Sequence, residues 1–159
     1  MVELSRTVVN FFEKQQIVLV STADKKGVIN IAIKGIAKIE SEGIIYIIDL
    51  YDGNTRLNLK DNPNITIASV NEEIFRGWQI KGIAKEHDSQ ETQKILEHWD
   101  KKIVQRISNR IISNIKKKTK LDHSEIHLPK PKYIIEMKVT EIIDLSGKIH
   151  TGEIYEIKK

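Results

Sequence analysis

A chain of 159 residues, 40% of them hydrophobic and 30% charged, suits one globular domain with a core and is too hydrophobic for a disordered protein. The absence of cysteine excludes disulfides, thiol nucleophiles and cysteine-held metals, so redox chemistry would need an organic cofactor or other metal ligands. A net charge of +4 leaves the partner open, and without a long apolar run or a leader-like start we expect a cytoplasmic protein with a single domain over residues 1–159.

The first part of the chain predicts one helix followed by a meander of strands. Apolar residues recur at helical spacing over 3–14, which predicts an amphipathic helix. Strands are expected over the segments 17–22, 28–34, 36–39 and 44–48. The alternation of Ile29, Ile31 and Ile33 with smaller or polar residues is typical of a strand with one buried side, and Gly35 predicts a bulge or bend. The run 44–48 is apolar enough to be buried on both faces.

The second part adds a short helix, more strands and a long helix. The short helix is expected over 55–60, with Asn54 or Asp52 as its N-cap and a stop before Pro63. Two strands, the long helix and a final strand follow over the segments 65–70, 77–85, 89–119 and 132–146, and the tail is expected to add a small hairpin. Six strands with short turns predict a mainly β (α+β) fold, a six-stranded antiparallel split β-barrel with flanking helices, because closing the sheet removes its exposed edges.

Few side chains stand at spacings that indicate catalysis or a metal. His123 and His127 lie four residues apart, as zinc ligands on a helix do, but no third ligand accompanies them, so we expect no metal site. The sequence has no nucleotide-binding glycine loop and no Ser/His/Asp arrangement, and we nominate no catalytic residue. The lysines and arginines over 101–120 indicate the solvated face of a helix or, alternatively, a nucleic-acid-binding face.

Three motifs follow one another along the chain. They are Ser21-Thr22 with Gly27 and the run NIAIK at 30–34, then NTRLNLKDNP at 54–63, then WQIKGIA at 78–84. Together they resemble the pyridoxamine 5′-phosphate oxidase-like family of FMN-binding split barrels. The resemblance covers a core of residues 5–88, and the final strand fits loosely. Its most diagnostic part is the short helix, which in that family lies beside the FMN phosphate.

The resemblance implies a homodimer that holds FMN between its subunits. The cofactor-binding positions that it implies are Asn30, Ile31, Ala32, Ile33 and Lys34 along the isoalloxazine, Asp49, Leu50 and Tyr51 at the pocket edge, Asn54, Thr55 and Arg56 at the phosphate, and Gln79 and Lys81 on neighbouring strands. The chemistry agrees, because a helix N-terminus with a hydroxyl and a guanidinium suits a dianionic phosphate. Reduced flavin also gains from nearby positive charge.

The C-terminal part departs from the family pattern. Pyridoxamine 5′-phosphate oxidases carry an arginine- and tryptophan-rich segment that grips the substrate phosphate, whereas this chain ends IHTGEIYEIKK. We therefore expect an FMN-dependent oxidoreductase or electron carrier with another small-molecule redox substrate. The alternatives are a related barrel that binds the deazaflavin F420 or haem, and a non-catalytic barrel that binds nucleic acid.

Overall fold

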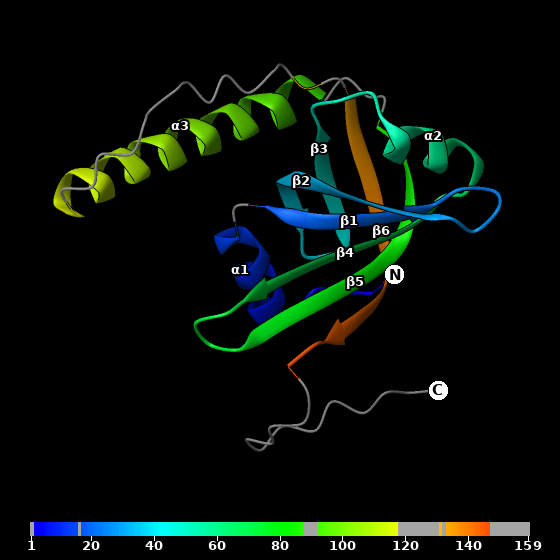
Figure 1. The fold of residues 1–159 in the computed structure, drawn as a ribbon, viewed down its shortest axis with the longest axis horizontal. Coiled ribbons are helices and arrows are strands. Elements are labelled where there is room, and N and C mark those ends of the chain that lie inside the picture. Colours follow the sequence, from blue (N-terminus) through cyan, green and yellow to red (C-terminus); the bar gives the residue numbers. More distant parts are fainter. Residues whose placement is uncertain (1, 16, 88–91, 118–130, 132, 147–159) are drawn as a thin grey trace.

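The fold is a closed barrel of antiparallel strands with helices around it (Figure 1). The computed structural model describes residues 2–15, 17–87, 92–117, 131 and 133–146, and the side chains of the long helix as far as residue 105. The elements are α1 Arg6–Lys14, β1 Val18–Ala23, β2 Ile29–Glu40, β3 Ile44–Asp49, α2 Asn54–Asp61, β4 Asn64–Asn71, β5 Arg76–Glu86, α3 Thr92–Lys117 and β6 Tyr133–Asp144. The strands pair antiparallel in the order β1-β2-β3-β6-β5-β4, with β4 also paired to β1. The described residues thus confirm the predicted six-stranded antiparallel barrel with flanking helices.

Two elements differ locally from the expectation. The helix α1 begins at Arg6 because Ser5 is its N-cap, with the Ser5 hydroxyl accepting a hydrogen bond from the Val8 N–H at 3.4 Å. Strand β2 runs through Gly35 without a break, and the register shift against β3 lies further on, between Ile36 and Lys38. Gly35 has a different role, because a Cβ there would collide with the indole ring of Trp99 in α3.

The barrel interior forms the main core. Isoleucines from β3, β4 and β5 meet Met137 of β6 there, and α1 adds Val8 and Phe12 to the same cluster. A second cluster lies outside the barrel, where Trp99 of α3 packs with Tyr46 of β3 and Ile134 of β6. Strand β3 is therefore covered on both faces, as its continuous apolar sequence predicts.

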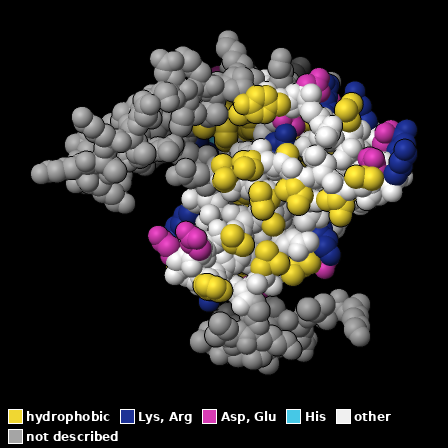
Figure 2. Space-filling model, in the orientation of Figure 1, with side chains coloured by type: hydrophobic (Ala, Val, Ile, Leu, Met, Phe, Trp, Pro, Cys, Tyr) yellow, Lys and Arg dark blue, Asp and Glu magenta, His cyan; other side chains and the backbone are white. Residues whose placement is uncertain are grey.

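The outward face of the sheet around β1 is apolar and exposed. On β2, Ile29, Ile31 and Ile33 are 63–67% exposed, although their alternation predicts a buried side. Leu19 of β1 lies opposite Ile33 and Val70 continues the outward row of β4, and both side chains are also exposed. We call these five residues the apolar sheet face; Figure 2 shows apolar side chains spread over this side of the barrel. The expectation fails because Lys34, and not an isoleucine, is the buried side chain of this part of β2.

Candidate functional site

A buried carboxylate organises one end of the barrel. Asp49, the last residue of β3, is fully buried and accepts three hydrogen bonds. Lys34 Nζ donates to Asp49 Oδ1 at 2.5 Å, the Tyr51 N–H donates to the same oxygen at 3.1 Å, and the Tyr133 hydroxyl donates to Oδ2 at 2.7 Å. A buried charge is stable only when it is paired and hydrogen-bonded in this way. The network therefore joins β2, β3, the loop after β3 and the start of β6.

Strand register explains why these side chains converge. Lys34 lies opposite Val18, whose side chain is in the barrel core, so Lys34 points to the inner side of the sheet. Asp49 lies opposite Tyr133 in the pairing of β3 with β6, which brings together two residues that are 84 positions apart. The three inward groups therefore meet at a single barrel end.

Tyr133 is the neutral member of this network. Burial, followed by the hydrogen bond and the charge of Asp49, raises the pKa of Tyr133 well above its ordinary value, and the nearby Arg56 opposes the rise. The phenol therefore stays protonated and keeps donating to Asp49. The Arg56 guanidinium carbon lies 4.9 Å from the centroid of the Tyr133 ring, which is a cation–π contact.

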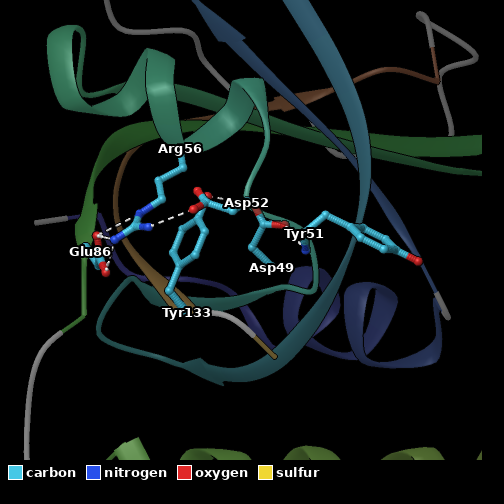
Figure 3. A network of polar contacts seen from close by, with 6 residues as sticks. All are labelled: Asp49, Tyr51, Asp52, Arg56, Glu86 and Tyr133. Atoms are coloured by element: carbon cyan, nitrogen blue, oxygen red, sulfur yellow. Dashed lines mark hydrogen bonds and ion pairs between the residues drawn. The ribbon is translucent and has the colours of Figure 1, made fainter. Parts of the chain in front are cut away.

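Arg56, in the first turn of α2, is held by two carboxylates (Figure 3). Its Nε donates to Glu86 Oε2 at 3.2 Å, and its Nη2 donates to both Glu86 oxygens at 3.0 and 3.1 Å. Its Nη1 donates to Asp52 Oδ2 at 3.2 Å. The hydrogen bonds that Arg56 donates to Glu86 and then to Asp52 raise the pKa of Arg56 above its ordinary value, so its charge is constant at any physiological pH.

The start of α2 differs from the expectation. Gly53 is the N-cap, so the prediction of Asn54 or Asp52 is wrong, and no side chain caps the helix. The Asp52 carboxylate pairs with Arg56 instead, which is the physical reason that it does not cap. The Arg56 and Leu57 N–H groups donate to the Gly53 carbonyl at 3.1 and 3.3 Å, so an anion at this helix end would be bound by the N–H groups of Asn54 and Thr55.

Buried polar side chains fix α2 on the barrel end. Asn58 Nδ2 donates to the Thr22 hydroxyl of β1 at 3.1 Å, and Thr55 is buried on the same helix. With these side chains turned to the barrel, Leu57 is exposed and Arg56 extends over Tyr133 toward Glu86.

The other predicted cofactor positions divide between the two sides of the sheet. Asn30 and Ala32 are half-buried on the same side of β2 as Lys34, whereas the side chains of Ile31 and Ile33 lie on the apolar sheet face. Gln79 and Lys81 lie on the outward side of β5, where Lys81 pairs with Glu141 at 2.9 Å. Leu50 is half-buried beside the cluster under α3, Asn54 begins α2, and Tyr51 is 65% exposed.

The network contains three residues that were not among the predicted cofactor positions: Asp52, Glu86 and Tyr133. Asp52 and Arg56 stand at the i, i+4 spacing of a helical ion pair, a signal that was present in the sequence. Glu86 and Tyr133 gave no such signal, because only the closing of the barrel brings them to α2.

A second polar cluster joins Glu136 of β6 to Lys85 and His87, the residues on either side of Glu86 in the sequence. His87 Nδ1 and Lys85 Nζ contact Glu136 at 2.8 and 3.1 Å. Burial would raise the pKa of Glu136, but the hydrogen bonds with His87 and Lys85 outweigh it and lower this pKa.

In the described part of the chain no group of histidine or acidic residues could hold a metal ion, and no helix is long and apolar enough to cross a bilayer. His123, His127 and the expected tail hairpin lie outside the described residues.

The sequence matches a known family model over most of its length. The model of the pyridoxamine 5′-phosphate oxidase family covers residues 4–145. An uncharacterised protein of Methanocaldococcus jannaschii is 28% identical over 155 residues, which are 96% of this chain and 88% of that protein.

Solved structures of several proteins resemble the barrel. HupZ of Group A Streptococcus gives a TM-score of 0.66 at 20% identity, over 91% of this chain and 95% of that one. An FMN-binding protein from Syntrophomonas wolfei gives 0.60 at 14% identity, over 88% and 82%. An F420 reductase gives 0.56 at 11% identity, over 88% and 98%. At these identities the likeness shows a common fold.

Proposed function

We propose that this chain, which belongs to the pyridoxamine 5′-phosphate oxidase family, is an FMN-binding flavoprotein that works as an oxidoreductase or electron carrier. The observation that carries the proposal is that Lys34, Asp49 and Arg56, three of the cofactor positions implied by the sequence motifs, belong to one connected network around Tyr133. The common fold with the FMN-binding protein of Syntrophomonas wolfei supports it.

The first turn of α2 would hold the phosphate. Arg56 supplies a permanent positive charge and a planar set of donors, and the uncapped N-terminus of α2 supplies N–H groups. Tyr51, exposed beside Asp49, and the β2 segment 30–34 would border the isoalloxazine. The bound flavin would supply the redox chemistry, and the chain would bind and orient it.

The proposal includes a homodimer formed through the apolar sheet face. Exposed contiguous apolar surface on a small protein marks an interaction site, and this face carries three isoleucines of one strand. Ile31 and Lys81 lie on the same outward side but are separated by β1 and β4, about 14 Å along the sheet. A second copy packed on this face would bring β5 of one subunit toward β2 of the other, which suits a cofactor held between subunits.

The test is to identify what the native protein binds. We expect yellow protein with the absorption bands of flavin, and one FMN per chain by mass spectrometry after denaturation. Apo-protein is then titrated with FMN, F420 and haem in parallel. Colourless protein that fails to bind added FMN would contradict the proposal, and tight binding of F420 alone would favour the cofactor of the structurally similar F420 reductase.

A further inference from the structure

The phosphate-binding edge of Arg56 already holds a carboxylate of the chain. Arginine binds phosphate and carboxylate with two parallel N–H groups. Nε and Nη2 form such an edge, and both donate to Glu86, while Nη1 donates to Asp52. A ligand anion therefore finds the guanidinium engaged by acidic side chains of the chain itself.

We propose that Glu86 is an internal competitor for Arg56 and restricts the site to ligands that carry a phosphate monoester. This inference rests on the proposed function. A ligand carboxylate that displaced Glu86 from Arg56 would replace one monoanion with another. It would also lose translational and rotational entropy, so its net binding free energy would be small. A phosphate monoester carries nearly two negative charges at neutral pH, so it interacts more strongly with Arg56 and with the start of α2.

The surroundings of Glu86 allow the exchange. Glu86 is the last residue of β5, its side chain is 46% exposed, and the hydrogen bonds of its carboxylate in the described structure all go to Arg56. Its carboxylate can therefore turn into water without leaving a buried group unpaired. The ring of Tyr133 stays in contact with the guanidinium, and Tyr133 is itself fixed by Asp49.

Lys34 does not replace Arg56 as the cation that a ligand anion would bind. It is buried, and its ammonium group is already paired with the buried Asp49. A ligand that took Lys34 away from Asp49 would leave a buried carboxylate without its counter-charge, which is costly. Competition at the site therefore centres on Arg56, whose two carboxylate partners are both partly exposed.

The test compares Glu86→Gln with the wild type by calorimetric titration of FMN, riboflavin and inorganic phosphate. Because partly exposed ion pairs are worth little, we expect FMN and phosphate to bind about two- to fivefold more tightly to the variant. Riboflavin, which lacks the phosphate, should bind equally to both. Glu73→Gln removes the same charge from the exposed β4–β5 turn and should change none of the three affinities.

Two outcomes would overturn the inference. Unchanged FMN and phosphate affinities in Glu86→Gln would mean that Glu86 does not compete, and weaker binding would mean that it positions Arg56 for the ligand. If Glu86→Gln does not fold, Glu86→Asp replaces it in the test. This variant keeps the charge but shortens the side chain, and it should also bind phosphate more tightly than the wild type. If neither protein binds FMN while phosphate still prefers the variant, the flavin proposal fails and the competition stands.

Discussion

At the residue scale, Asp49 is the group on which the polar barrel end depends. Donors from β2, the loop after β3 and β6 converge on its carboxylate, which is fully buried. An exposed ion pair at Asp61 and Lys25 offers the opposite environment on the same molecule. Because both are Lys–Asp pairs, the same substitution in each aspartate measures how burial changes the contribution of such a pair to stability.

We expect Asp49→Asn to lower the free energy of unfolding by about 3–5 kcal/mol, because it leaves the Lys34 ammonium buried without a counter-charge. Asp61→Asn should cost less than about 1 kcal/mol, as for other exposed pairs. Urea denaturation followed by circular dichroism measures both. Equal losses in the two variants would show that the Lys34–Asp49 pair is not a buried one.

Tyr133 should make the folded protein less stable at alkaline pH. Its pKa is raised in the folded state, so the folded chain keeps the phenol proton where the unfolded chain loses it, above about pH 10. The stability that this group contributes is therefore fully present below pH 10 and is lost as the pH rises further. Urea denaturation should show that the free energy of unfolding falls more between pH 9 and pH 11 for the wild type than for Tyr133→Phe.

Tyr51→Phe is the control for this pH dependence, since Tyr51 is exposed and only its backbone N–H bonds to Asp49. It should retain the wild-type loss between the two pH values. A Tyr133→Phe variant with that same loss would assign the alkaline sensitivity to other groups.

Arg56 is expected to contribute to phosphate binding as a charge. Arg56→Gln should weaken FMN binding about tenfold while leaving riboflavin binding nearly unchanged, because hydrogen bonds to charged groups are the stronger ones. Arg76→Gln changes an exposed arginine at the start of β5 and serves as the matched control. Equal weakening of FMN and riboflavin would show that Arg56 supports the fold of the site and not the phosphate.

At the scale of the element, α3 is attached to the barrel through a close approach of Trp99 to β2. Gly35 lies against the indole ring, and Trp99 is buried with Tyr46 and Ile134. The described part of α3 adds Ile95 and Ile103 to the same contact. A side chain at position 35 would therefore displace the Trp99 ring from β2.

We expect Gly35→Ala to destabilise the protein by about 1–3 kcal/mol, since the added methyl group overpacks a formed contact. Gly53→Ala is the control, because a Cβ at Gly53 meets no atom within 4 Å and its φ of −125° is open to alanine. Hydrogen exchange should show faster exchange in residues 92–105 of the Gly35 variant alone. Slow exchange there in both variants would contradict the role of Gly35.

At the scale of the whole molecule, the apolar sheet face determines the expected assembly. An Ile31→Glu substitution places a charge in the middle of that face, once in each copy of a two-fold dimer. We expect the dissociation constant of the dimer to rise at least about tenfold, because a buried isoleucine is worth about 1.5–3 kcal/mol. Size-exclusion chromatography with light scattering measures the change.

Val104→Glu is the control for the dimer experiment. Val104 is exposed to a similar extent but lies on α3 and is not a residue of the apolar sheet face. This variant should keep the wild-type oligomeric state. Dissociation by Val104→Glu and not by Ile31→Glu would move the interface from the sheet to the long helix.

The amino-acid sequence by itself determined the order and type of the elements. Alternation of apolar residues located the strands, helical spacing located α1 and α3, and the three motifs indicated the family that the comparison then showed. These features depend on neighbours within a few positions of one another, such as Gly43 between β3 and the strand before it. Local pattern is sufficient for them because the side-chain period of a helix or strand and the residue preferences of a turn are properties of a short segment.

Only the tertiary structure decided which side of each strand meets the core and which distant residues meet each other. A period of two defines two faces of β2 but does not say which face is buried. In the structure the face with Lys34 is turned to the barrel interior, and Ile29, Ile31 and Ile33 are exposed on the other face. The contacts of Arg56 with Glu86 and Tyr133 arise in the same way. They depend on barrel closure and on the register of β5 and β6, and these are set by the packing of the whole sheet and not by any short segment.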